Sequence, residues 1–317
     1  MMPAHENTPA ASSAGGPLDA IQLGIGNWAW TDQYFWGNPQ AYSEADARAA
    51  FEVSLAHGVT FIDTAEVYGF GGAERMLGRF MRGAGQSLMI ATKFYPYPWR
   101  LTRGSLRRAL EGSLRRLGVE QVALYQIHVP LPPVPIEAWM EALADVVDAG
   151  LTQRVGVSNY NLPKMRRAFA ALSRRGVRLA SNQVDFSLLQ RAPERDGLLA
   201  ACHELGVRLI AYSPLAQGLL TGKYTPDSPP PAIRRRRYAR VLGRIEPLIG
   251  LMREIGEAHG GKSVAQVALN WAMCKGTLPI PSVRSAQQAE ENAGALSWQL
   301  TDDQVAALDE MSDRIAR

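Results

Sequence analysis

Cysteine is scarce in this chain of 317 residues, which contains two, Cys202 and Cys274. Neither has the Cys-x-x-Cys partner of a zinc site, and two cysteines cannot make a disulfide framework. Long apolar runs are missing too, because no stretch approaches the roughly 18 residues that indicate a membrane-spanning helix. Residues 1–17 lack the basic start and apolar middle of a secretory signal. We therefore expect a disordered tail over residues 1–17 and a cytoplasmic protein.

The chain also lacks a large excess of charge of either sign. Lys and Arg number 34 against 30 Asp and Glu, which gives a formal net charge of +4. The arginines are scattered along the chain, whereas a nucleic-acid-binding protein is expected to gather them on one face. A hydrophobic fraction of 46% is ordinary for a globular protein. We expect a protein that binds neither nucleic acid nor a membrane.

Short apolar runs recur along the rest of the chain, each followed by a stretch with helical spacing. Runs without polar–apolar alternation are typical of strands buried on both faces of a parallel sheet. They lie at residues 21–25, 59–63, 88–93, 122–128, 154–158, 179–184, 208–213 and 277–281. Eight strands alternating with helices predict a single-domain (β/α)8 TIM barrel over residues 18–317, with an open doubly wound sheet as the alternative.

The helix boundaries and one long interval refine this prediction. Capping boxes at residues 43–46, 263–266 and 301–304 predict helix starts, the last of them for a C-terminal helix. The interval between the last two predicted strands is about twice the usual βα length. It holds a Pro- and Arg-rich segment, residues 224–238, and two predicted helices. We expect this excursion to cross the barrel mouth, where long loops are usually functional.

Two glycine motifs resemble nucleotide-binding loops but lack the flanking secondary structure that such loops require. Residues 256–263 fit the Walker A spacing, but a helix precedes them where the mechanism requires a strand. We expect a helix stop there, followed by Ser263 as the next N-cap. Gly24-x-Gly26-x-x-Ala29 follows a strand, but an aromatic run rather than a helix comes next. We expect this segment to be a loop at the barrel mouth.

Four ionisable side chains indicate an active site. Asp63, Lys93 and His128 each end one of three successive predicted strands, and Tyr68 follows Asp63 by five residues. In a (β/α)8 barrel the active-site groups come from the carboxyl ends of the strands, which lie about 4.8 Å apart. The alternative is a structural Asp63–Lys93 ion pair beside two satisfied polar residues. Because a rare lysine lies within an apolar run, the four together favour an active site.

These four residues suit the protonation of an oxygen atom. A tyrosine has a pKa near 10, and we expect the Lys93 ammonium to lower the pKa of Tyr68. Asp63 would keep Lys93 charged and oriented toward Tyr68. Tyr68 could then protonate a carbonyl oxygen as a hydride reaches the carbonyl carbon, with His128 as a second donor. The set contains no nucleophile and no cluster of metal ligands.

The segment Gly58-Val-Thr-Phe-Ile-Asp63-Thr-Ala-Glu-Val-Tyr68-Gly69 closely resembles the signature of the aldo-keto reductases. The resemblance runs from about residue 20 to residue 315. Phrases such as GVSNY, SNQVDFSLLQRAPE and LIAYSPLAQGLLTGKYTP are most similar to the plant and bacterial branch that contains pyridoxal reductase-like proteins. The resemblance implies a (β/α)8 barrel, a bound nicotinamide cofactor, and a catalytic tetrad of Asp63, Tyr68, Lys93 and His128 with Tyr68 as the proton donor.

The resemblance also implies which residues bind the nicotinamide and pyrophosphate of the cofactor. Ser158, Asn159 and Gln183 match positions that hold the nicotinamide carboxamide, and their polar side chains are what an amide requires. Tyr212 matches the aromatic side chain that stacks on the nicotinamide ring. The pyrophosphate-binding turn and its continuation match Ser213, Leu215, Gln217, Gly218 and Lys223.

At the adenine end, Arg284 falls where family members carry the cation for the 2′-phosphate. Gln288 and Asn292 match positions near the adenine. A guanidinium fork suits a phosphate, so the resemblance implies NADPH (NADP+) rather than NADH. Ser282 departs from the glycine that is frequent in this branch. The arginines at 234–237 are interpreted either as a clamp for the cofactor phosphates or as part of a solvated loop.

Three functions compete on this sequence. The favoured one is NADPH-dependent reduction of an aldehyde or ketone. We expect the aromatic residues at 95–99 and those after the first strand to line a pocket for an aromatic or pyridoxal-like carbonyl. Val129 replaces a tryptophan of many relatives in that wall. The alternative is an NADPH-binding regulatory subunit that resembles the potassium-channel β-subunits and has little turnover. A sugar-phosphate isomerase or lyase would need a carboxylate base near the substrate.

Overall fold

The computed structural model describes residues 18–32, 43–85 and 87–316. The predicted tail over residues 1–17 lies outside them, as do Tyr34, Phe35 and Trp36 of the aromatic run. Within the described residues, eight parallel strands follow one another in chain order. They are β1 (Gly24–Gly26), β2 (Phe61–Asp63), β3 (Met89–Phe94), β4 (Leu124–Ile127), β5 (Val155–Ser158), β6 (Leu179–Asp185), β7 (Arg208–Tyr212) and β8 (Leu278–Ile280).

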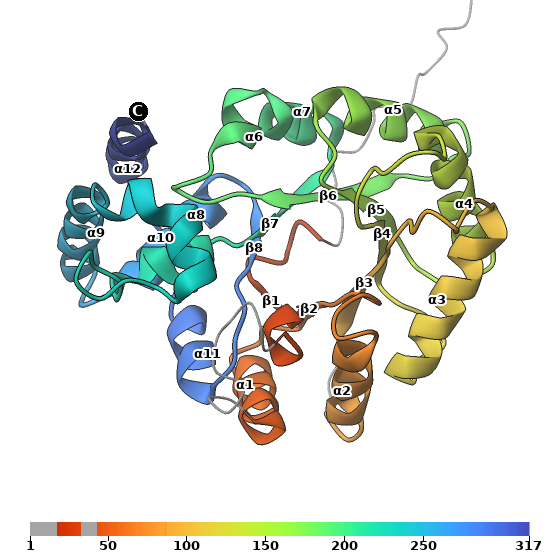
Figure 1. The fold of residues 1–317 in the computed structure, drawn as a ribbon, viewed down its shortest axis with the longest axis horizontal. Helices are drawn as coiled ribbons and strands as arrows, with labels where there is room; N and C mark the ends of the chain where they lie inside the picture. Colours follow the sequence, from red (N-terminus) through yellow and green to blue (C-terminus); the bar gives the residue numbers. More distant parts are fainter. Residues whose placement is uncertain (1–17, 33–42, 86, 317) are drawn as a thin grey trace, which may run out of the picture.

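The sheet curls into a nearly closed barrel, because its first and last strands meet. The backbone N–H of Gly26 donates to the carbonyl of Pro281 at 3.0 Å, and Gly26 forms a parallel bridge with Ser282. Helices alternate with the strands and surround them (Figure 1). The predicted (β/α)8 barrel is confirmed.

The helices and turns of the described residues run in the following order. They are η1 (Trp28–Trp30), α1 (Glu44–Ala56), α2 (Gly72–Met81), α3 (Arg103–Leu117), α4 (Ile136–Asp148), α5 (Leu162–Ser173), α6 (Ala192–Arg195), α7 (Leu198–Leu205), η2 (Ala216–Thr221), α8 (Ala232–Leu242), α9 (Glu246–Ala258), α10 (Val264–Cys274), α11 (Ala286–Ala293) and α12 (Asp302–Ala316). The capping boxes at 43–46, 263–266 and 301–304 all form, so each predicted helix start is confirmed. Within the described ranges, none of the helices combines the length and the apolar composition that a membrane span requires.

The excursion between β7 and β8 differs from the prediction in one respect. Its described residues contain three α-helices rather than two, because the Arg-rich segment itself forms α8. Pro231 stands at the N-cap of α8, where a proline does not interrupt the helix. The Walker-like segment is a helix stop, with Gly260 and Gly261 at φ of 77° and 81° and Ser263 capping α10. After Gly26 the chain makes one 3-10 turn, η1, where a loop was expected.

The inside of the barrel is built in two layers that follow from the period of two residues along a strand. Phe61, Ala91 and Leu124 are fully buried and pack in one apolar layer with residues of β7 and β8. Two residues further along β2, β3 and β4 stand Asp63, Lys93 and Gln126, which face the same side as the apolar residues before them. The apolar layer therefore closes the barrel beneath a polar layer at the carboxyl ends of the strands.

Candidate active site

The polar layer centres on an ion pair that the barrel buries almost completely. Lys93 is 0% exposed and Asp63 is 2% exposed. The Lys93 ammonium donates to Asp63 Oδ1 at 2.5 Å, to the carbonyl of Thr64 at 2.9 Å and to the hydroxyl oxygen of Tyr68 at 3.2 Å. The structure thus brings three of the four predicted catalytic residues into direct contact. Because Lys93 donates to the Tyr68 oxygen, the phenolic hydrogen must point elsewhere.

The electrostatics of this contact differ from the prediction for Tyr68. Burial raises the pKa of Tyr68, and the charge of Lys93 offsets only part of that rise. The expected lowering of this pKa is therefore wrong, since burial at the barrel mouth outweighs the neighbouring ammonium. Burial works to lower the pKa of Lys93, but the attraction of Asp63 and Tyr68 outweighs it and the pKa is raised. Lys93 is charged and Tyr68 keeps its proton at neutral pH.

His128 lies directly after β4 and completes the set. The imidazole contacts the edges of two tyrosine rings, with centroids 5.8 Å from Tyr68 and 5.6 Å from Tyr95. Burial and the charge of Lys93 lower the pKa of His128 to about 3. Its Nδ1 is buried and has no hydrogen-bond partner among the described residues. The imidazole is therefore neutral at pH 7 and is held by packing.

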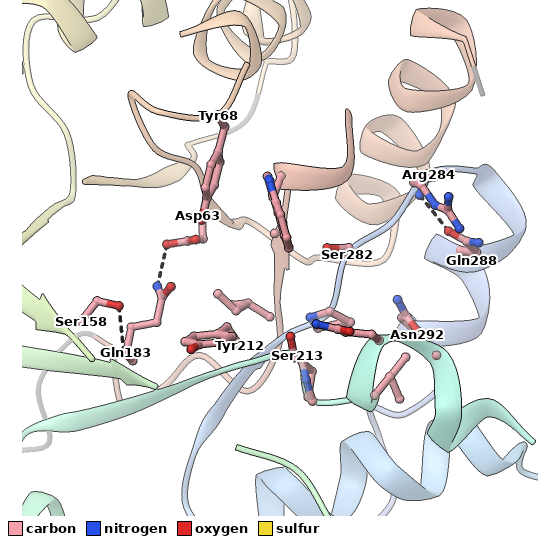
Figure 2. Close-up of a pocket in the computed structure, with 18 of the residues that line it drawn as sticks. Asp63, Tyr68, Ser158, Gln183, Tyr212, Ser213, Ser282, Arg284, Gln288 and Asn292 are labelled. Atoms are coloured by element: carbon pink, nitrogen blue, oxygen red, sulfur yellow. Dashed lines mark hydrogen bonds between the residues drawn. The ribbon is translucent and has the colours of Figure 1, made fainter. Parts of the chain in front are cut away.

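Two glutamines of the polar layer orient Asp63. Gln183 Nε2 donates to Asp63 Oδ2 at 2.8 Å, and Gln126 Nε2 approaches the same oxygen at 3.5 Å (Figure 2 draws the Gln183 bond). The resemblance implies nicotinamide binding for Gln183, and the contact that the structure shows is with the Asp63 carboxylate. Gln126 was missed by the sequence reasoning. The signal was its position, since it is a polar residue inside an apolar run and lies two residues before His128.

The ends of β5 and β7 carry a second hydrogen-bonded set. Ser158 Oγ donates to the backbone carbonyl of Gln183 at 2.9 Å. Asn159 Nδ2 donates to the carbonyl of His128 at 3.0 Å, and Asn159 Oδ1 accepts from the hydroxyl of Tyr212 at 3.0 Å. Asn159 has a φ of 62°, in the left-handed region where asparagine is tolerated better than most side chains. This conformation costs energy, and such strain concentrates at ligand sites.

The turn after β7 is strained in the same way. Ser213, Ala216 and Gln217 have φ values of 50°, 45° and 55°, and Gly218 follows at 96°. Within this turn the backbone N–H groups of Ala216 and Gly218 donate to the carbonyls of Ser213 and Leu215, at 2.8 and 2.9 Å. The side chain of Gln217 is 7% exposed, and its Oε1 has no hydrogen-bond partner among the described residues.

One of the four arginines of the excursion supports this turn. Arg234, on α8, is 3% exposed. Its Nη1 donates to the carbonyl of Gln217 at 2.9 Å and to the hydroxyl of Tyr224 at 3.2 Å. Arg236 is exposed. The interpretation as a wholly solvated loop is therefore wrong for Arg234.

One cavity of about 710 Å³ joins these groups. Apart from Lys93, which lies buried behind Asp63 and Tyr68, every predicted site residue lines it. Those residues are Asp63, Tyr68, His128, Ser158, Asn159, Gln183, Tyr212, Ser213, Leu215, Gln217, Gly218, Lys223, Arg284, Gln288 and Asn292. Its volume lies in the range of small-molecule sites, about 300–1,000 Å³.

The two ends of the cavity differ in chemistry. Asp63 and Tyr68 lie on one side, with Tyr212 below them in the view, and Arg284 with Gln288 lies on the other (Figure 2). The backbone N–H of Arg284 donates to Gln288 Oε1 at 2.9 Å, which ties the loop after β8 to α11. The arrangement suits an elongated ligand with an anionic part at the arginine end and a reacting part beside Tyr68. No group of three or more metal-ligating side chains occurs in the described part of the chain.

Comparison with known proteins gives matches over almost the whole chain. Residues 22–313 match the model of the aldo/keto reductase family. Pyridoxal reductase of Arabidopsis thaliana, named as chloroplastic, is 39% identical over 307 residues, which cover 93% of this chain and 84% of the relative. A solved aldo/keto reductase of Klebsiella pneumoniae, in complex with NADP and acetate, gives a TM-score of 0.73 at 29% identity over 92% of this chain and 91% of that one. A thermostable aldo-keto reductase in complex with the inhibitor epalrestat gives 0.75 at 30% identity over 92% and 94%.

Proposed function

The chain belongs to the aldo/keto reductase family, and from this premise we propose that it reduces an aldehyde or ketone to the alcohol with NADPH, Tyr68 acting as the general acid. The observation that carries the proposal is the contact of Tyr68 with Lys93 at 3.2 Å, at the wall of a cavity of about 710 Å³. NADPH, when bound, supplies the hydride.

Each residue of the tetrad has its own role in the proton transfer. Tyr68 keeps its proton at neutral pH and presents it to the cavity, because its oxygen already accepts from Lys93. The Lys93 ammonium then stabilises the negative charge that develops on the Tyr68 oxygen as the proton leaves. Asp63 holds that ammonium in place. His128 is neutral and can donate a second hydrogen bond to the substrate oxygen.

The polar groups of the cavity suit NADPH from one end to the other. Ser158, Asn159 and Gln183 offer the donors and acceptors that a carboxamide requires, and Tyr212 offers a ring face beside them. We propose that the turn at residues 213–218 holds the pyrophosphate, since Ser213, Leu215, Gln217 and Gly218 line the cavity. The Gln217 amide, whose Oε1 has no hydrogen-bond partner among the described residues, can turn either its oxygen or its nitrogen to a ligand.

At the far end the residues suit the rest of the nucleotide. We propose that Arg284 binds the 2′-phosphate and that Gln288 and Asn292 contact the adenine, since all three line the cavity. Of the four arginines, Arg234 can act on the phosphates through the turn that it holds. These assignments are the reason that we propose NADPH rather than NADH.

The substrate end is apolar and aromatic. Trp28, Val67, Tyr95 and Val129 line the cavity around Tyr68 and His128. Where Val129 replaces a tryptophan of many relatives, the wall leaves more room for a ring. We propose an aromatic or pyridoxal-like carbonyl compound as the substrate, and the relative named pyridoxal reductase supports this choice. The cytoplasmic location expected from the sequence stays a prediction.

A carbonyl screen tests the proposal. The purified protein is mixed with NADPH and, in turn, 4-nitrobenzaldehyde, pyridoxal and an aliphatic aldehyde, and both NADPH absorbance and the alcohol product are measured. We expect turnover with the aromatic carbonyls, with one alcohol formed per NADPH consumed. Tight NADPH binding without turnover on any carbonyl would instead favour the regulatory subunit.

A further inference from the structure

The aromatic wall beside His128 is held by an ion pair that the reaction itself does not use. Glu66 lies between Asp63 and Tyr68 on the β2–α2 loop, and its side chain is 8% exposed. Arg100, on the β3–α3 loop, forms a two-point ion pair with Glu66, in which Nη2 donates to Oε2 at 3.0 Å and Nη1 donates to Oε1. The pair joins two loops that are 34 residues apart in the chain.

The same ion pair holds the backbone of Tyr95 on both sides. Glu66 Oε1 accepts the backbone N–H of Tyr95 at 2.8 Å, and Arg100 Nη1 donates to the carbonyl of Tyr95 at 2.9 Å. Tyr95 therefore cannot shift without breaking a hydrogen bond to a charged group, and such bonds are stronger than those between neutral groups.

Tyr95 in turn contacts the imidazole of His128. The rings meet edge to face, with centroids 5.6 Å apart and planes at 75°, and the Tyr68 ring makes a second such contact at 5.8 Å and 84°. Since Nδ1 of His128 has no hydrogen-bond partner among the described residues, no side-chain bond from that atom fixes the ring. Its orientation depends on the two tyrosines, and that of Tyr95 depends on Glu66 and Arg100.

We infer that Glu66 and Arg100 are positioning residues, which hold Tyr95 against His128 and so fix the imidazole plane and the substrate wall of the cavity. The kinetic part of this inference rests on the proposed reductase function. Neither residue lines the cavity, so neither touches the reacting atoms. Both act through Tyr95.

Glu66→Ala tests the inference with little danger to the fold, because the Arg100 side chain is 22% exposed and can be hydrated when its partner is lost. Glu66→Gln is the conservative variant, since its amide oxygen can still accept from the Tyr95 N–H. Glu137→Ala is the matched control. It breaks another two-point pair, with Arg167 at 2.9 and 3.0 Å, on the exposed faces of α4 and α5.

We expect Glu66→Ala to lower kcat/KM for 4-nitrobenzaldehyde about tenfold to a hundredfold, because a small displacement of an oriented group has effects of that size. Its affinity for NADPH should stay unchanged, because neither Glu66 nor Arg100 lines the cavity. Glu66→Gln should recover part of the loss, and Glu137→Ala should lose nothing. In a Tyr95→Ala background, Glu66→Ala should add no further loss. Independent, additive losses, or an equal loss of NADPH affinity, would overturn the inference.

A second readout needs no turnover. The chain has five histidines, so the ring signals in an NMR spectrum of ¹⁵N-histidine-labelled protein are few, and His128→Asn assigns one of them. Glu66→Ala should shift or broaden the His128 signal and leave the other histidines unchanged, as Glu137→Ala should leave all of them. An unmoved His128 signal would refute the positioning role. If the wild type reduces no carbonyl, the proposed function fails, while this spectrum still decides the role of Glu66.

Discussion

Removing the charge of Lys93 should destabilise the fold as well as stop turnover. In Lys93→Met the side chain keeps its length and apolar stem, but Asp63 loses the ammonium at 2.5 Å. The Asp63 side chain is 3% exposed, so water does not replace the lost partner, and two glutamine amides remain. Breaking a buried ion pair on one side costs about 3–5 kcal/mol. We expect a loss of that size in the free energy of unfolding.

Equilibrium unfolding in urea measures this loss, and the double variant identifies its cause. With a slope of about 3 kcal/mol per molar urea, the midpoint of Lys93→Met should fall by about 1 M or more. Asp63→Asn with Lys93→Met removes both charges, and it should be more stable than Lys93→Met alone. Arg107→Met, which removes an exposed pair with Glu111, is the control and should cost under about 0.5 kcal/mol.

The pKa of Asp63 determines how the stability deficit of Lys93→Met changes with pH. Burial already raises the pKa of Asp63, and without Lys93 the pKa rises further. A carboxyl with a raised pKa in the folded state takes up a proton on folding, so stability is lost as pH rises through that pKa. The deficit of Lys93→Met relative to wild type should therefore shrink as pH falls toward 4. A deficit under about 1 kcal/mol at pH 7, or losses that add in the double variant, would refute the buried-pair reasoning.

Three further predictions concern the cavity. Arg284→Ala should weaken NADPH much more than NADH in equilibrium binding, because NADH has no 2′-phosphate, and an equal loss for both would contradict the assignment. Because the pKa of His128 is about 3, far below its ordinary value, kcat should show no His128-dependent inflection between about pH 5 and pH 8, and a break near 6.5 that vanishes in His128→Gln would contradict this. Val129→Trp should reduce kcat/KM for aromatic aldehydes more than for a short aliphatic aldehyde, and the reverse order would place the substrate elsewhere.

The barrel and its rim could be predicted because their signals are local. Apolar runs mark the strands, and the two-residue period places Asp63 and Lys93 on the inside of neighbouring strands. The contacts that organise the site are not local, since Gln126 meets Asp63 across 63 positions and Arg100 meets Glu66 across 34. The pKa of Tyr68 was mispredicted for the same reason, because burial depends on the assembled barrel. In the excursion, the prolines before α8 gave no indication that a helix follows them. This helix contains Arg234, which lines the cavity.

The kinetics of Tyr68→Phe test the central claim most directly. This variant keeps the ring and removes only the hydroxyl that receives the Lys93 bond. Stopped-flow measurement with NADPH and 4-nitrobenzaldehyde should give a hydride-transfer rate about 10²- to 10⁴-fold below wild type, the range of general-acid catalysis, with NADPH affinity unchanged. A rate within about threefold of wild type would mean that the proton comes from another group.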